Sequence, residues 1–215
     1  MISTRHLSPL PDISSLKKLT QSLALLDAII CPEWEYRYYS FDAHWTNNLS
    51  VFFMRNGSGD EFIILFAKEG AVIKGFAHES AMSPYRHSPL QVWAGVIDEI
   101  PKVLRTYLLD PAFELSATTF CIWRTVSDTK WKCGNVMFPD DPLGDGSAML
   151  LTMLDGDPTT YQTYAQEYYE KTFELSAIKH VYQHLLLTDE VVKDLNSELT
   201  LSDFNKELQT IGYIG

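Results

Sequence analysis

Cysteine is scarce in this 215-residue sequence, and its three cysteines are unevenly spaced. Cys31, Cys121 and Cys133 include no pair with the two-residue spacing of a zinc knuckle or redox motif, and three are too few for a disulfide framework. We therefore expect buried thiols in a reducing compartment.

Long apolar runs are absent as well. No stretch approaches the roughly 18 apolar residues that a membrane span requires. The apolar stretch of residues 23–30 is interrupted by Asp27, and it lacks both a preceding basic region and a small-residue cleavage site. We expect a cytoplasmic protein that does not associate with membranes.

Several catalytic signatures are missing too. The sequence has no Gly-x-Ser-x-Gly elbow and no cysteine with an upstream histidine signature. The glycine-containing residues 56–59 lie between predicted strands and not before a helix, so they do not predict a phosphate-binding loop. We expect no cofactor, and the sequence favours a binding function over a catalytic one.

Positive charge is the other scarce property. The sequence has 17 Lys and Arg against 28 Asp and Glu, and its formal net charge at pH 7 is -11. A net negative field disfavours encounter with nucleic acids and anionic membranes, and it favours cationic surfaces. We therefore expect no nucleic-acid partner, and we expect any protein partner to be basic.

The composition is otherwise that of a globular protein, with 46% hydrophobic and 21% charged residues. Apolar residues recur at three- and four-residue intervals from residue 12 to residue 30, which predicts an amphipathic helix that ends before Pro32. Residues 35–41 are rich in Tyr and Phe and predict a strand, whereas the polar residues 42–48 predict a turn.

The clearest pattern is a β-meander in the middle of the chain. Three β-rich runs, residues 50–55, 60–66 and 71–76, are separated by glycine-containing turns, which predicts an antiparallel sheet. In residues 62–66 the apolar side chains occupy both odd- and even-numbered positions, which face opposite sides of a sheet. Both faces should therefore be covered, and we expect helices on the second one.

The rest of the chain predicts loops, two further strands and a helical end. The predicted fold is α+β, with an antiparallel β-meander sheet flanked by helices, a helical C-terminal segment and a single domain spanning residues 1–215. The remaining predicted elements are a loop at 78–91, a helix at 96–109 interrupted at Pro101, strands at 118–125 and 132–138, a loop at 139–147, and helices at 160–174, 177–185, 189–195 and 201–208.

His78 and Glu79 form the first candidate site, because they fall where the third meander strand runs into the long loop. A histidine titrates near neutrality and, beside a carboxylate, can serve acid–base chemistry. Adjacent residues on an extended chain point to opposite sides, so a role in anchoring the loop is the competing interpretation.

Two other patterns contain metal-ligand residue types. His180 and His184 are four residues apart on a predicted helix, but two ligands do not make a site. Asp140, Asp141 and Asp145 lack calcium-loop spacing and are typical of turns. We expect no metal site.

Aromatic residues are the last candidates. Trp123, Arg124 and Trp131 could contribute to a binding surface, because aromatic and arginine side chains dominate binding hot spots. Core packing is the competing interpretation for the tryptophans, and a cation–π contact or a buried ion pair is the competing interpretation for Arg124.

Several strings resemble a family of uncharacterised bacterial proteins with no established activity. They are MRNGSGD at residues 54–60, KGFAHES at 74–80, TFCIWR at 119–124, and the shorter segments 154–156 and 211–213. The resemblance covers most of the chain. In general character that family is similar to immunity proteins of bacterial toxin systems.

We therefore expect a non-catalytic cytoplasmic protein-binding domain of the immunity type that neutralises a basic toxin, with His78, Glu79, Trp123, Arg124 and Trp131 as candidate binding residues. One alternative is a small hydrolase or metal-dependent enzyme that uses His78 and Glu79 beside a pocket lined by the two tryptophans. Another is a homo-oligomeric module whose C-terminal helices pair. The sequence leaves the partner, the substrate and the oligomeric state open.

Overall fold

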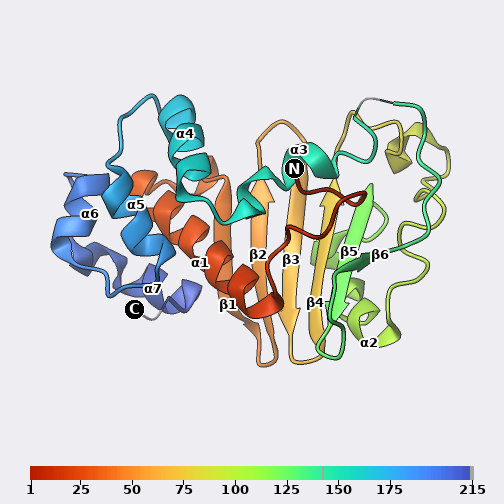
Figure 1. Cartoon of the computed structure of the whole chain (residues 1–215), viewed down its shortest axis with the longest axis horizontal. Helices are drawn as coiled ribbons and strands as arrows, with labels where there is room; N and C mark the ends of the chain where they lie inside the picture. The colour runs from red at the N-terminus through yellow and green to blue at the C-terminus, as the bar shows by residue number, and fades with distance from the viewer. Residues whose placement is uncertain (142, 214–215) are drawn as a thin grey trace.

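The computed structural model describes residues 1–141 and 143–213. A six-stranded antiparallel sheet in the order β1-β2-β3-β4-β5-β6 forms its centre, and most of the helices lie on one face of the sheet or beyond the β1 edge (Figure 1). The predicted α+β class, with its meander and helical C-terminal segment, is confirmed. The strands are β1 (Tyr39–Thr46), β2 (Leu49–Arg55), β3 (Glu61–Ala67), β4 (Gly70–Phe76), β5 (Phe120–Thr125) and β6 (Lys132–Cys133).

Side-chain alternation gives the sheet two apolar faces. On the first face, buried residues of neighbouring strands lie opposite one another and form a row. The adjacent residue of each strand points to the second face, and these residues form another row there. The first row is Phe52, Ile64, Ile73 and Ile122, and the second is Val51, Leu65, Val72 and Trp123. A one-residue slip in any strand would exchange the rows, so the two cores fix the register.

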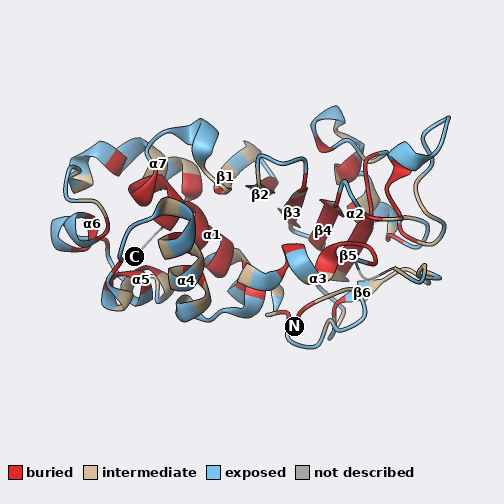
Figure 2. Cartoon of the chain, turned by 90° about the horizontal axis from the view of Figure 1, so that it is seen from above, coloured by how far each residue is buried: buried red, intermediate tan, exposed pale blue. Residues whose placement is uncertain are grey.

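Helix α1 (Ile13–Ile30) covers the β1 side of the first face and is nearly as buried as the strands (Figure 2). It begins at Asp12, whose carboxylate accepts the backbone N–H of Ser15 at 3.0 Å. Every residue from 19 to 30 is buried, because the C-terminal helices pack on the side of α1 that the sheet does not cover. The C-terminal helices are α4 (Pro158–Tyr169), α5 (Leu175–Tyr182), α6 (Asp189–Leu195) and α7 (Asn205–Ile211).

The second face is covered mainly by irregular chain between residues 77 and 118, so the expectation of helices there is only partly met. The predicted helix at 96–109 is reduced to α2 (Lys102–Arg105) and the 3-10 turn Tyr107–Leu109. Pro101 disfavours helical backbone at the residue before it, and α2 therefore begins only after the proline.

The predicted strand at 35–41 is largely wrong. Trp34–Tyr36 form a 3-10 turn, η1, and β1 extends through the residues predicted as a turn. In β1 the polar residues Asp42, His44 and Thr46 alternate with less polar neighbours, which is the pattern of a half-covered strand.

Two of the later predicted elements differ from expectation, whereas the helix predicted at 189–195 is α6 (Asp189–Leu195). The predicted strand at 132–138 is reduced to β6, because the chain at Gly134 passes so close to Gly95 that a Cβ atom would collide with the Gly95 carbonyl oxygen. The helix predicted at 201–208 is the 3-10 turn Leu201–Phe204 followed by α7. Within the described residues, no helix is both long and apolar enough to cross a membrane.

A buried carboxyl group joins three of these elements. Asp27 of α1 has no exposed surface, and its Oδ2 accepts the backbone N–H groups of Tyr38 and Tyr39 at 2.9 and 2.8 Å. Its Oδ1 accepts the hydroxyl of Tyr161 in α4 at 2.7 Å. Burial raises the pKa of Asp27 from 3.8 to about 6, although these hydrogen bonds oppose the shift.

The raised pKa predicts how stability depends on pH. The folded chain binds the Asp27 proton more tightly than the unfolded chain, so this group lowers the free energy of unfolding as pH rises from about 4 to about 6. Asp27→Asn should abolish that contribution, because an amide does not titrate in this pH range. It can still accept the two N–H groups and donate to the Tyr161 oxygen. Urea unfolding at several pH values measures the effect.

The exposed Asp140→Asn variant is the control, and its stability curve should remain parallel to that of the parent chain. If the curve of Asp27→Asn also ran parallel to the parent between pH 4 and pH 6, the raised pKa of Asp27 would be wrong.

Candidate functional site

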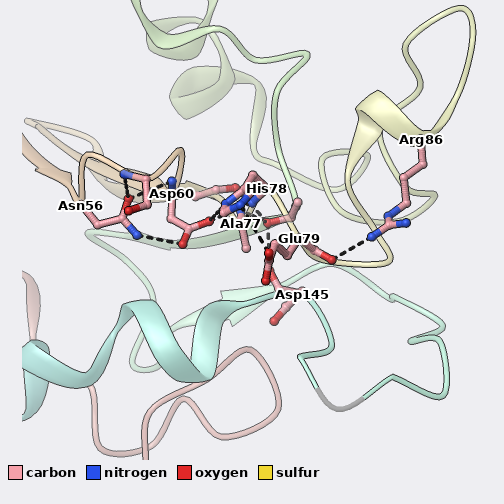
Figure 3. A network of polar contacts seen from close by, with 10 residues as sticks. Asn56, Asp60, Ala77, His78, Glu79, Arg86 and Asp145 are labelled. Carbon is pink, nitrogen blue, oxygen red and sulfur yellow. Dashed lines mark hydrogen bonds and ion pairs between the residues drawn. The ribbon is translucent and has the colours of Figure 1, made fainter.

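The candidate residue His78 follows β4, and its imidazole contacts a carboxylate that precedes β3 (Figure 3). Because β3 and β4 are antiparallel neighbours with Glu61 opposite Phe76, Asp60 and His78 lie at the same end of the sheet. The Nδ1 of His78 lies 2.7 Å from Oδ1 of Asp60, which also accepts the His78 backbone N–H at 2.9 Å.

Asn56 holds the carboxylate from the other side. Its Nδ2 donates to Oδ2 of Asp60 at 2.8 Å, and its Oδ1 accepts the Asp60 backbone N–H at 3.0 Å. The β2–β3 turn and the loop after β4 are therefore connected through one buried carboxylate. Sequence reasoning missed Asp60 and Asn56, because only the β3–β4 register brings them to His78.

The geometry of the pair allows general-base chemistry. Asp60 accepts the proton of Nδ1 in the neutral imidazole, which leaves Nε2 as the free acceptor. The side chain of His78 is 41% exposed, and Oε1 of the 75%-exposed Glu79 lies 3.8 Å from Nε2. That separation is too long for a hydrogen bond, and it permits an ion pair when the imidazole is protonated.

The polar groups around the Asp60–His78 pair form hydrogen bonds that hold the neighbouring loops in place. Ser80 is buried and its hydroxyl donates to the Gly144 carbonyl at 2.7 Å, while Asp145 accepts the Thr4 hydroxyl and the Ser147 backbone N–H. Within the residues that the structure describes, no hydroxyl or thiol hydrogen bonds to His78. The adjoining hollow has a volume of about 90 Å³, well below the roughly 300 Å³ of a small substrate pocket.

The other three candidate residues do not lie with His78. Trp123 is 3% exposed on the second face of the sheet, whereas Trp131 is 6% exposed on the first, where its Nε1 donates to the Pro11 carbonyl. Arg124 lies at the opposite end of β5 from the His78 loop, and its Nε donates to the Asp128 carbonyl. The structure therefore contradicts the expected pocket of two tryptophans beside His78 and Glu79.

The buried lysine and cysteine of the second face were not among the candidates. Lys74 of β4 is 1% exposed, its Nζ lies 3.6 Å from Oε1 of Glu61, and burial lowers its pKa. Cys121 pairs with it in register, and burial raises the pKa of this thiol to about 12. A thiol with that pKa remains protonated and is a poor nucleophile.

The two histidines considered as metal ligands are engaged elsewhere. α5 ends at Tyr182, so His184 is beyond the helix, and its Nε2 lies 2.7 Å from the Lys18 carbonyl oxygen. His180 Nε2 lies 2.8 Å from the Leu186 carbonyl oxygen. Throughout residues 1–141 and 143–213, no group of three or more His, Cys, Asp and Glu side chains is placed to hold a metal ion.

A different surface carries much of the acidic charge. We call α4 to α7 with their connections, residues 155–213, the helical block; Figure 1 shows its helices beside the β1 edge, away from β6. The sequence from residue 155 to its end has eleven acidic and four basic side chains. The exposed acids therefore give this end of the molecule a strong negative field.

A groove of about 880 Å³ runs between the helical block and the end of α1, and we call it the acidic groove. Ile30 and Cys31 line it at the carbonyl end of α1, where Asn196 donates to the Ile29 carbonyl and Arg37 donates to the Cys31 carbonyl. The charged lining residues are Glu33, Asp194 and Glu198 against Lys171 and Lys193.

Comparisons of the chain with protein-family models, curated proteins and solved structures found no match. The geometry defines an α+β protein with a histidine–carboxylate pair in one loop and an acidic groove between the helical block and the end of α1.

The hydrogen bonds of Asp60 predict a structural role for that carboxylate. Asp60→Ala should lower the free energy of unfolding by about 1–3 kcal/mol, because it leaves donors of His78 and Asn56 without an acceptor. Glu79→Ala removes only an exposed carboxylate and should change the stability by less than about 0.5 kcal/mol. Urea unfolding compares the two, and equal losses would contradict the assignment.

Proposed function

We propose that this protein is a non-catalytic binding domain whose acidic groove receives a basic protein partner. The observation that carries the proposal is the concentration of acidic side chains on the helical block. Complementary charge accelerates encounter and discriminates against wrong partners, so a surface of this sign selects cationic ones.

The acidic groove also has a volume and a lining that suit a protein partner. Its volume of about 880 Å³ accommodates several side chains of a partner, and the acids Glu33, Asp194 and Glu198 come from two separate parts of the chain. A lysine or arginine of the partner can therefore pair with these acids at the groove.

The catalytic alternative has less support. The Asp60–His78 pair has the orientation of a general base, but a hydrolase also needs a nucleophile or an activated water beside a substrate pocket. Among the described residues no hydroxyl or thiol bonds to His78, and the hollow there is small.

We extend the proposal to a narrower function, in which the partner is a basic toxin that this domain neutralises. The strings at residues 54–60, 74–80 and 119–124 support it, through their resemblance to a family with the character of immunity proteins. Co-expression tests this part: the chain should restore growth to cells that express the partner, and continued growth arrest would contradict the narrower function.

Charge reversal tests the groove. The partner is recovered by affinity purification from the native cells, purified, and titrated calorimetrically against the chain. The triple variant Glu33→Lys, Asp194→Lys, Glu198→Lys should weaken binding at least about tenfold, because it reverses three charges that face the partner. Added salt should weaken binding to the parent chain.

The matched control is the triple variant Glu79→Lys, Glu114→Lys, Asp140→Lys, which makes the same change in net charge at exposed positions away from the helical block. Its affinity should remain within about threefold of the parent. An equal loss of affinity in both variants would show that only the net charge matters. That result would contradict binding of the partner at the acidic groove. An acidic partner would contradict the proposal altogether.

A further inference from the structure

A second hollow, of about 480 Å³, lies at the β1 edge of the sheet, between η1, β1, β2 and α7. The chain that covers the second face reaches β1 through Phe113, which packs against Trp45 with ring centroids 5.5 Å apart. Beyond that contact the outer part of β1 and β2 remains open. We call this space the cationic hollow, for the reasons that follow.

Aromatic side chains form much of its wall. Trp45 of β1 and Phe53 of β2 pack against each other with centroids 5.5 Å apart, and Trp34 of η1 stands at the border. The exposed fraction of Trp34 is 56%, which is high for so large an apolar side chain. These rings provide flat apolar surfaces against which another ring can pack.

Basic side chains complete the hollow. Arg55 at the end of β2 places its guanidinium carbon 4.6 Å from the Trp34 ring centroid and 5.6 Å from that of Phe53. Lys206 of α7 is exposed at the same hollow. Within the part of the chain that the structure describes, neither cation forms an ion pair.

The carboxylates of the hollow already have partners. Glu207 accepts Nη1 of Arg37 at 3.0 Å, and Arg37 also donates to the carbonyl oxygens of Cys31 and Pro32. Asp42 accepts the His44 backbone N–H at 2.7 Å. The lining therefore has three cations, Arg37, Arg55 and Lys206, against two carboxylates, and it carries an excess of positive charge in a chain whose formal net charge is -11.

We propose that the cationic hollow is a binding site for a small aromatic anion, whose ring packs on Trp45 and Phe53 and whose carboxylate or phosphate pairs with Arg55 and Lys206. A guanidinium stacked on a ring keeps the N–H groups of its edge free for an anion. The volume lies within the roughly 300–1,000 Å³ of small-molecule sites.

This site is independent of the acidic groove. The two differ in sign and share no lining residue, since Glu33 lines the groove and Trp34 lines the hollow. A basic partner fits the groove and is repelled by Arg55 and Lys206. A variant that no longer binds the basic partner at the groove should therefore still bind the aromatic anion in the hollow, and the reverse should also hold.

Calorimetric titration with naphthalene-2-carboxylate tests the proposal, with 2-naphthamide as the neutral ligand of the same shape and acetate as the anion without a ring. The carboxylate should bind saturably with one site per chain and quench tryptophan fluorescence, because Trp34 and Trp45 line the hollow. Both controls should bind at least tenfold more weakly. Equal binding of the amide, or no saturation by the carboxylate at millimolar concentration, would overturn the proposal.

Variants locate the site. Arg55→Gln and Lys206→Gln should each weaken naphthalene-2-carboxylate binding by several fold, and the double variant by at least tenfold, with unchanged circular dichroism. Lys130→Gln removes an exposed cation near β6, at the other end of the sheet, and should leave the affinity unchanged. Full affinity in the double variant, or an equal loss in Lys130→Gln, would overturn the assignment to this hollow.

Discussion

The arrangement of the molecule depends on one buried carboxyl group, Asp27. It connects the last turns of α1 to the first residues of β1 through the backbone of Tyr38 and Tyr39, and to α4 through the Tyr161 hydroxyl. Burying a carboxyl group is unfavourable, as its raised pKa shows, and the three hydrogen bonds offset part of that cost. The helical block thereby keeps a defined position beside the sheet edge.

Both proposed binding surfaces lie next to this junction. The chain leaves α1 at Cys31, passes Glu33 at the acidic groove and Trp34 at the cationic hollow, and enters β1 at Tyr39. Arg37 holds the short connection by binding two of its carbonyl groups and Glu207 of α7. A few residues of rigid backbone therefore separate two hollows of opposite charge.

The sequence predicted the parts of the fold that have regular local signals. Two-residue alternation and glycine turns located β2 to β4, and three- and four-residue spacing located α1. β1 was misplaced because Asp42 and His44 look like turn residues, although they alternate correctly for an edge strand with one polar side. The order of β2 to β4 follows from these local turns, whereas the pairing of β4 with β5 spans residues 77–119, and no local pattern contains it.

The candidate site was harder to predict because it depends on register. His78 and Glu79 could be found in the sequence, but Asp60 joins them only through the pairing of β3 with β4. Trp123 and Trp131 are close in the sequence, and yet they pack on opposite faces of the sheet. The two binding surfaces combine segments more than a hundred residues apart, which only the three-dimensional arrangement brings together.

Hydrogen–deuterium exchange of the chain, free and bound to its basic partner, tests the central claim most directly. The account predicts slower exchange on binding at the lining of the acidic groove, in residues 30–33, 169–173 and 193–199, with little change in the loop that follows β4. Protection confined to residues 77–91 around His78, with none at the groove, would contradict it.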